Sequence, residues 1–390
     1  MSPRRVEEIV LELERLYADL ALGSVKAWKA ADPGRRAVGS LPVYAPREVL
    51  WAAGALPVFV RGGGDAIETI RGDAYYQSYI CHLPRSVLEL GLGGWLDALD
   101  GMLFPNTCDV IRNLSGIWAT SFPGKLVRFL DPPQSYAPGT AAAWWRHELE
   151  RLYKDVCALS GRTPNDAALA SAIREYAAVR AALVGLARAR KATPWLVPAD
   201  EAYLLRRAGD LTPPGEYVAL VHEYLEAARG RSARREDRIK VVVRGAFCEQ
   251  PPLGLIRAVE KAGCYVIDDD LLVGLDAPVS EVAEGGDPLA ALARAYVADG
   301  GAIAIRYDEH ARRGPELVAQ VKALGADGVV FMAASFCDPA LLDQPRVTQA
   351  LDDAHVPYAA FKYAENTGQM APIREQAGTF ADSIKLWSAA

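Results

Sequence analysis

Three cysteines in this chain lie where a thiolate could hold a metal. Cys81 comes directly before a segment with helical periodicity, and Cys108 follows a short apolar segment of the kind that forms a buried strand. Cys337 follows a second segment of this kind, much later in the chain. Thiolate sulfur is a soft ligand that suits iron–sulfur clusters, zinc and copper(I). A fold that gathers these three thiols would therefore be able to bind a cluster with one iron left open to an external ligand.

Two of these cysteines end similar stretches of sequence. Residues 100–109 (DGMLFPNTCD) and 327–338 (DGVVFMAASFCD) each run from an Asp-Gly turn signal through an apolar strand to Cys-Asp. Upstream, residues 46–60 and 252–267 share the order helix, Ala-Gly, strand. The repeats predict an internal duplication of an α/β unit. Because ligands gather at the carboxyl ends of parallel strands, we expect Cys108 and Cys337 to point into one cleft, with Cys81 approaching it from a helix N-terminus that favours thiolate.

Core packing is the alternative for any single cysteine, because free cysteine is among the most buried residue types. No Cys-x-x-Cys pair marks a zinc or ferredoxin site in this sequence. Cys157 lies in a predicted helix and Cys264 opens a predicted strand, so both are assigned to the core. Cys248, in the loop after a strand, is a weaker candidate ligand.

Length and composition indicate a globular protein with more than one core. The chain has 390 residues, of which 51% are hydrophobic and 24% charged, with a net charge of −6. No broad basic field is present, so we expect no nucleic acid partner. The charged N-terminus and the lack of long apolar runs predict a cytoplasmic chain with no membrane partner.

The order of predicted elements gives an α/β fold. A packing helix over residues 3–30 precedes a strand–helix–strand unit at 37–60, and helices dominate 140–190. A second α/β half starts at residue 240. The expected domains are 1–135 (N-terminal helix and first α/β domain), 136–238 (helical connector) and 239–390 (second α/β domain with a closing helix).

Each candidate for the acid that would donate a proton also has a structural interpretation. His82 is a candidate because it adjoins Cys81, although a histidine beside a cysteine is more often structural. Glu48 could cap the helix after Pro46 rather than act on a substrate. For the acidic residues 268–270, turn chemistry and helix capping are the alternative to catalysis.

Several stretches together resemble one enzyme family over nearly the whole chain. They are PVYAPREVLWAAGALPV (42–58), QSYIC (77–81), LDGMLFPNTCDVIRNL (99–114), FCEQPP (247–252), DDDLLVG (268–274), FCDP (336–339) and GQMAPIREQAGTF (368–380). The chain resembles the benzoyl-CoA reductase and 2-hydroxyacyl-CoA dehydratase family. Within it, YYQSYICHLPRS and FPNTCDVIRNL are most similar to the smaller substrate-binding subunits of ATP-dependent benzoyl-CoA reductases.

The resemblance implies two Rossmann-like parallel-sheet domains with additional helices, and a [4Fe–4S] cluster held by Cys81, Cys108 and Cys337. It also implies a homologous cluster-binding partner subunit, separate ATP-hydrolysing subunits that deliver electrons, ferredoxin as the upstream donor, and an aromatic acyl-CoA substrate. The chain has no G-x-x-x-x-G-K-[ST] phosphate loop, in agreement with ATP hydrolysis on another subunit.

The functional hypothesis is an oxidoreductase subunit that reduces the ring of benzoyl-CoA with low-potential electrons. One alternative is a 2-hydroxyacyl-CoA dehydratase subunit, in which the same electron is recycled to expel water. Another is an electron-relay or assembly subunit whose cluster never touches the substrate, and a third is a scaffold without a cluster.

Overall fold

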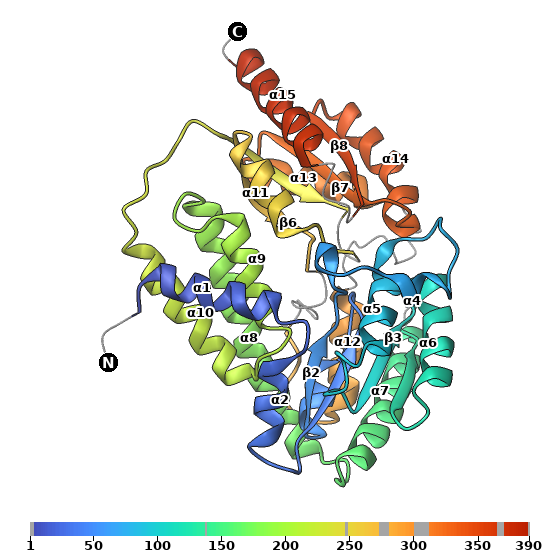
Figure 1. The fold of residues 1–390 in the computed structure, drawn as a ribbon. Helices are drawn as coiled ribbons and strands as arrows, with labels where there is room; N and C mark the ends of the chain where they lie inside the picture. Colours follow the sequence, from blue (N-terminus) through green and yellow to red (C-terminus); the bar gives the residue numbers. More distant parts are fainter. Residues whose placement is uncertain are drawn as a thin grey trace.

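The computed structural model describes residues 4–136, 139–245, 249–272, 281–299, 312–364 and 370–388. Its centre is formed by two four-stranded sheets in which every strand pairing is parallel. Parallel strands need crossover connections, which place helices on the sheet faces. In Figure 1 the two sheets lie one above the other, with α1, α8, α9 and α10 beside them. The predicted α/β class with two parallel sheets is confirmed.

The first sheet has the strand order β2-β1-β3-β4. Its strands are β1 (Arg36–Ser40), β2 (Ala55–Phe59), β3 (Gly101–Pro105) and β4 (Leu126–Leu130). The helical segments within this unit are α3 (Arg47–Ala52), η1 (Gly64–Ala66), α4 (Ile70–Asp73), α5 (His82–Leu92) and α6 (Asp109–Ser121). All residues of β2 and β3 are buried, as expected for strands covered on both faces.

The second sheet repeats this order as β6-β5-β7-β8. Its strands are β5 (Ile239–Arg244), β6 (Cys264–Asp269), β7 (Gly328–Ala334) and β8 (Tyr358–Tyr363). Its helices are α11 (Leu253–Lys261), α13 (Arg313–Leu324), α14 (Asp338–Asp353) and α15 (Met370–Ser388). In both sheets the second strand along the chain forms one edge. The first, third and fourth strands follow it across the sheet in that order. The shared topology confirms the predicted duplication.

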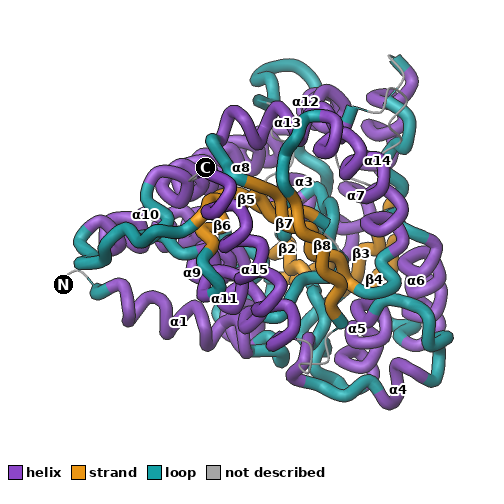
Figure 2. Tube along the Cα trace, turned by 90° about the horizontal axis from the view of Figure 1, so that it is seen from above, coloured by secondary structure: helices purple, strands orange, loops and turns teal. Residues whose placement is uncertain are grey.

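The remaining helices join the two units. They are α1 (Val6–Ala18), α2 (Gly23–Ala30), α7 (Thr140–Leu159), α8 (Asp166–Ala192), α9 (Ala199–Ala208), α10 (Pro214–Arg229) and α12 (Pro288–Asp299). The long helix α8 contacts α3 of the first unit and β6 of the second. Seen from above, the strands lie centrally among the helices (Figure 2). Among the described helices, none has both the length and the apolar composition that crossing a bilayer requires.

Helix α12 lies between β6 and β7 in the sequence but packs into the core of the first unit. Tyr296 of α12 stacks on Tyr44 with a centroid distance of 4.4 Å and on Trp145 at 5.2 Å. The two α/β units are therefore interlocked. The domain boundaries at residues 135 and 238 stay a prediction.

The prediction of one helix over residues 3–30 is wrong. The chain forms α1 and α2 there, with a break between them at which Leu22 has a left-handed φ of 56°. The Asp19 carboxylate accepts a hydrogen bond from the Gly23 N–H at 2.6 Å and so satisfies a donor at the start of α2. Apolar spacing continues across the break, which is why periodicity alone did not reveal it.

Candidate metal centre

Each of the three predicted cysteine ligands lies at the start of a helix. Cys81 is the N-cap of α5, Cys108 of α6 and Cys337 of α14. The N–H groups of a first helical turn carry partial positive charge and favour an anion beside them. Three such helix ends therefore favour thiolate, or an anionic cluster, at these sulfurs.

The structure brings the three cysteines together. They line one small cavity between the two units, whose other lining residues are Pro42, Leu83, Thr107, Asp109, Val110, Ile111, Phe336, Asp338 and Pro339. Cys81 and Cys337 are buried, and Cys108 is partly buried. The predicted convergence of the two repeats on one cleft is thus seen in the geometry. The assignment of the thiols as metal ligands stays a prediction.

At Cys81 and Cys108, burial outweighs the effect of the helix N-termini and keeps the thiols protonated until a metal displaces the proton. Burial raises the pKa of Cys81 well above its usual value, and negative charge on Glu249, Cys337 and Cys108 adds to the effect. Burial also raises the pKa of Cys108 to about 11, although the backbone N–H groups of Ile111 and Val110 oppose the shift. Metal binding at such a site would release protons.

The donor set fits a cluster better than a single ion. Within the described part of the chain, no three His, Cys, Asp or Glu side chains lie close enough together to hold one metal ion. A structural zinc needs about four ligands around one point. An iron–sulfur cluster distributes its thiolates over several irons, so the sulfurs need only surround a common space. Three soft donors around one cavity meet that requirement.

Two of the other cysteines are structural. Cys157 is 1% exposed in the core between the first sheet and α7, and Cys264 is 0% exposed in the core of the second unit. Their assignment to the core is confirmed. Cys248 lies outside the described residues.

Phe336, directly before Cys337, has an unusual backbone conformation. Its φ of 65° falls in the left-handed region, which costs a non-glycine residue about 1–2 kcal/mol. Its side chain is 52% exposed and lines both the cysteine cavity and a larger neighbouring pocket. Strained residues of this kind concentrate at functional sites.

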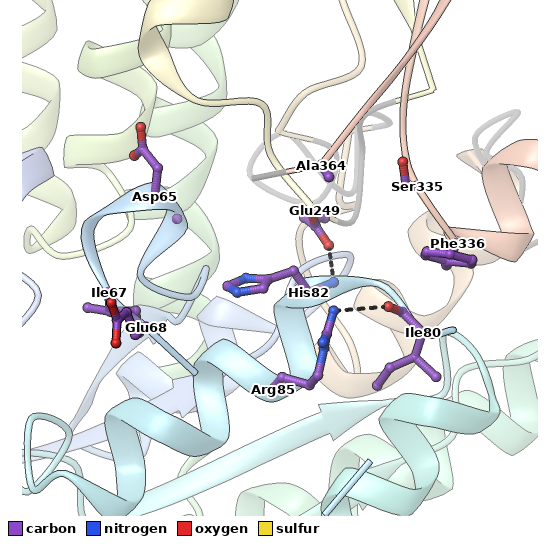
Figure 3. Close-up of a pocket in the computed structure, with 11 residues that line it drawn as sticks. Asp65, Ile67, Glu68, Ile80, His82, Arg85, Glu249, Ser335, Phe336 and Ala364 are labelled. Carbon is purple, nitrogen blue, oxygen red and sulfur yellow. Dashed lines mark hydrogen bonds between the residues drawn. The ribbon is translucent and has the colours of Figure 1, made fainter. Parts of the chain in front are cut away.

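The neighbouring pocket has a volume of about 390 Å³. Its lining, seen in Figure 3, comes from the segments that follow β2, β5, β7 and β8 and from around the start of α5: Gly64, Asp65, Ile67, Glu68, Ile80, His82, Arg85, Glu249, Ser335, Phe336 and Ala364. Pockets of this size accept small organic groups. His82 thus lies at the pocket, next to Cys81, while its role as proton donor stays a prediction.

Glu249 is a site residue that the sequence did not single out. Its carboxylate Oε2 accepts hydrogen bonds from the backbone N–H groups of His82 at 2.7 Å and Leu83 at 3.1 Å (Figure 3). Its backbone carbonyl accepts a hydrogen bond from the Tyr363 hydroxyl. A buried carboxylate of the second unit therefore holds the helix that begins after Cys81. The one available signal was an acidic residue in a loop after a strand, within FCEQPP.

A family model described as 2-hydroxyglutaryl-CoA dehydratase, D-component, matches residues 42–384 of this chain. The match covers every described strand except β1, and it includes all three cysteines. The chain belongs to this family.

Relatives from both branches of this family cover nearly the full length. A benzoyl-CoA reductase subunit of Thauera aromatica is 47% identical over 382 residues, which are 98% of this chain and 99% of that protein. (R)-2-hydroxyglutaryl-CoA dehydratase subunit beta of Acidaminococcus fermentans is 28% identical over 90% of this chain and 93% of that protein. Lactoyl-CoA dehydratase subunit beta of Anaerotignum propionicum is 26% identical over 97% of this chain and 100% of that protein.

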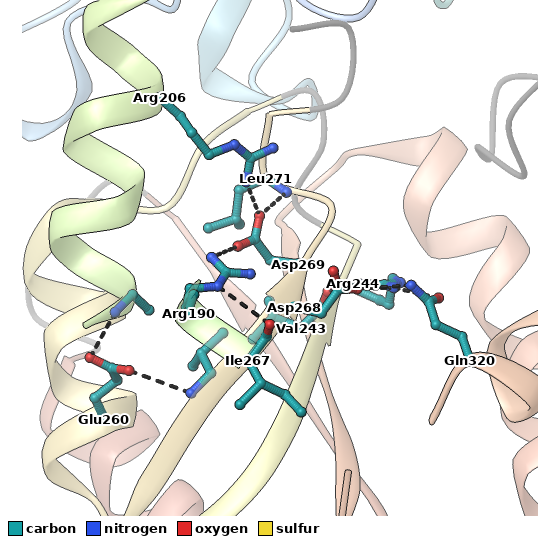
Figure 4. A network of polar contacts seen from close by, with 12 residues as sticks. Arg190, Arg206, Val243, Arg244, Glu260, Ile267, Asp268, Asp269, Leu271 and Gln320 are labelled. Carbon is teal, nitrogen blue, oxygen red and sulfur yellow. Dashed lines mark hydrogen bonds and ion pairs between the residues drawn. The ribbon is translucent and has the colours of Figure 1, made fainter. Parts of the chain in front are cut away.

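In this family member the other acidic candidates form buried ion pairs. Glu48 is 1% exposed and accepts a hydrogen bond from Arg180 of α8 at 2.6 Å, so the predicted cap of α3 is replaced by an ion pair. Asp269 lies between Arg190 at 2.5 Å and Arg206 at 2.8 Å (Figure 4). These pairs fasten the connector helices to the two units.

The neighbours of Asp269 complete this network. Asp268 accepts hydrogen bonds from Arg244 at 2.6 Å and Gln320 at 2.9 Å. Asp270 accepts one from the Gly245 N–H at 2.8 Å. The turn chemistry predicted for this trio is present in part, because Asp269 also accepts a hydrogen bond from the Leu271 N–H at 3.0 Å. The ion pairs were not predicted.

Proposed function

We propose that this chain is an iron–sulfur subunit of an ATP-dependent benzoyl-CoA reductase, which reduces the aromatic ring to a cyclohexadiene-carbonyl-CoA. The observation that carries the proposal is the convergence of Cys81, Cys108 and Cys337, from three helix N-termini, on one cavity. The proposed cofactor is a [4Fe–4S] cluster held by these thiolates. Identity of 47% with the benzoyl-CoA reductase relative favours the reductase branch over the dehydratase branch at 26–28%.

The cluster, when bound, would supply single electrons of low potential to a ring made reducible by its conjugated thioester. The chain's own residues would prepare the surroundings for that transfer. The pocket of about 390 Å³ would receive the acyl group, and Phe336 would separate it from the cysteines. Burial of the thiols excludes water, which strengthens electrostatic interactions at the site. His82, at the pocket, is the proposed proton donor.

The proposed complex has several components beside this chain. The relatives are named as subunits, which supports a homologous cluster-binding partner. Separate ATP-hydrolysing subunits would deliver the electrons, with ferredoxin upstream, and the complex would work in the cytoplasm. The lack of a phosphate loop in this chain agrees with ATP hydrolysis elsewhere.

Turnover by the reconstituted, anaerobically purified complex tests the proposal. We expect ATP-dependent reduction of benzoyl-CoA and no dehydration of 2-hydroxyacyl-CoA esters. The dehydratase branch is the second candidate because its beta subunits also align over 90% or more of this chain. Dehydration without ring reduction would establish that branch instead.

A structure with a bound CoA ester tests whether the chemistry takes place in this subunit. The proposal expects the acyl carbon in the pocket beside Phe336. An ester bound only in the partner subunit would make this chain an electron relay. Iron and sulfide analysis covers the remaining alternative, because a scaffold would contain neither.

A further inference from the structure

Glu249 connects the second unit to the helix that carries a predicted cluster ligand. It is 3% exposed and lies in the loop between β5 and α11. Its carboxylate accepts the N–H groups of His82 and Leu83, the first two residues of α5. The carboxylate is thus held at the helix end whose N-cap is Cys81.

This contact makes Cys81 different from Cys108. At Cys108, the N–H groups of Val110 and Ile111, in the first turn of α6, are directed at the sulfur. At Cys81, the N–H groups of the first two helical residues are directed to the Glu249 carboxylate. Leu83 occupies the same position relative to Cys81 that Val110 occupies relative to Cys108. One ligand therefore has helix N–H groups directed at its sulfur, and the other shares its helix end with a carboxylate.

The negative charge of Glu249 also acts on Cys81. Its carboxylate is held against the N–H groups of the two residues that directly follow Cys81. A buried charge is poorly screened by water and salt, so it acts strongly on its neighbours. The reduction potential of an iron–sulfur cluster depends on nearby net charge and on hydrogen bonds to its sulfurs. Added negative charge and fewer N–H donors both disfavour the reduced form.

We propose that Glu249 is a positioning residue that lowers the reduction potential of the cluster at Cys81. It does so by holding a buried negative charge beside this ligand and by taking the N–H of Leu83, whose equivalent at Cys108 is directed at the sulfur. The inference rests on the proposed cluster and gives a reason why the donor would be strong enough for an aromatic ring.

The test is the midpoint potential of the cluster in the purified complex, followed by electron paramagnetic resonance during a redox titration at pH 8. Glu249→Gln removes the charge and keeps an acceptor for the two N–H groups, so we expect a shift to higher potential. Glu249→Ala also frees the N–H groups and should shift the potential further. Glu249→Asp keeps the charge, so its midpoint potential should be the nearest of the three to that of wild type.

Glu260→Gln is the matched control. Glu260 is 7% exposed, belongs to the same unit and accepts the N–H of Ala199, the first residue of α9, at 3.2 Å. It lines neither the cysteine cavity nor the pocket. Its replacement should leave the midpoint potential unchanged.

Three results would overturn the inference. A Glu249→Gln potential equal to or below that of wild type, at full iron content, would show that the carboxylate does not set the potential. Loss of iron from Glu249→Gln would show that it holds the ligand helix in place rather than tuning it. A wild-type chain without iron would reject the proposed cluster and this inference together.

Discussion

Cys108 and Cys337 occupy equivalent positions in the two repeats. Each is the N-cap of the helix that follows the third strand of its sheet, α6 after β3 and α14 after β7. Both line the same cavity. The duplicated topology therefore brings the carboxyl ends of two equivalent strands to one place, and Cys81 joins them from the start of α5.

The first prediction concerns iron content. Cys81→Ser, Cys108→Ser and Cys337→Ser should each lower the iron and sulfide of the anaerobically purified protein, because serine oxygen is a poor substitute for a soft thiolate. Cys157→Ala is the control, since Cys157 is buried in a core away from the cavity. It should keep the full iron content. Full retention in any of the three serine variants removes that residue from the ligand set.

Local patterns were sufficient to predict most of the fold. The segment that forms β1, α3 and β2 has an apolar strand, a proline at the helix start and a glycine after the helix, and it folds as predicted. Gly54, after α3, has a φ of 85°, a conformation that few other residues accept. The repeated Asp-Gly-strand-Cys-Asp pattern placed Cys108 and Cys337 at strand ends for the same local reason.

Contacts between distant parts of the chain could not be predicted in this way. Glu249 and His82 are separated by 167 positions, and nothing in either local sequence indicates the other. The ion pairs from Asp269 to Arg190 and Arg206 likewise join β6 to two connector helices. Partner choice in these cases depends on how the two units pack, which periodicity does not specify.

The second prediction separates the backbone strain of Phe336 from the role of its ring. Phe336→Ala keeps the left-handed backbone strain, whereas Phe336→Gly relieves it. We expect the glycine variant to be more stable than the alanine variant by about 1 kcal/mol, because relief of about 1–2 kcal/mol exceeds the entropy cost of glycine. Urea denaturation measures the difference.

Both Phe336 variants lose the ring between the two cavities. They should therefore raise the KM for benzoyl-CoA to a similar extent, whatever their stability. A KM unchanged from wild type in both variants would place the substrate away from this residue.

The third prediction concerns Asp269, whose carboxylate is 2% exposed between Arg190 and Arg206. Asp269→Asn leaves buried positive charge without its carboxylate and should lower the free energy of unfolding by about 3 kcal/mol. Glu226→Gln, in an exposed pair with Arg229, should cause no measurable change. Equal stability of the two variants would contradict a stabilising role for the buried network.

The Asp269 carboxylate also makes the free energy of unfolding depend on pH. Burial favours its neutral form, but Arg190 and Arg206 hold the pKa of Asp269 well below its usual value. The stability that ionised Asp269 contributes is fully present above its pKa in the unfolded chain, about 4. It is lost as the pH falls towards the lower pKa of Asp269 in the folded protein. The stability difference between wild type and Asp269→Asn should therefore narrow below about pH 4.

The fourth prediction concerns Glu260, which lowers the stability as the pH rises, whereas Asp269 raises it. Burial, together with the negative charge of Asp200, raises the pKa of Glu260 from 4.5 to about 7. Between these values the folded protein keeps a proton that the unfolded chain has released, so stability falls as the pH rises from 4.5 to about 7 and is level above that. A shift of this size corresponds to about 3 kcal/mol.

Glu260→Gln resembles the protonated acid in shape and does not titrate. Any constant effect of the amide cancels when each protein is compared with itself at two pH values. The free energy of unfolding, measured in urea at pH 5 and pH 8, should therefore fall by about 2.5 kcal/mol less in Glu260→Gln than in wild type, since this interval captures most of the raised pKa's contribution. An identical change in both proteins would mean that Glu260 is already ionised at pH 5 in the folded state. The carboxylate that accepts the N–H groups of Ala199 and Val266 would then be charged throughout this range.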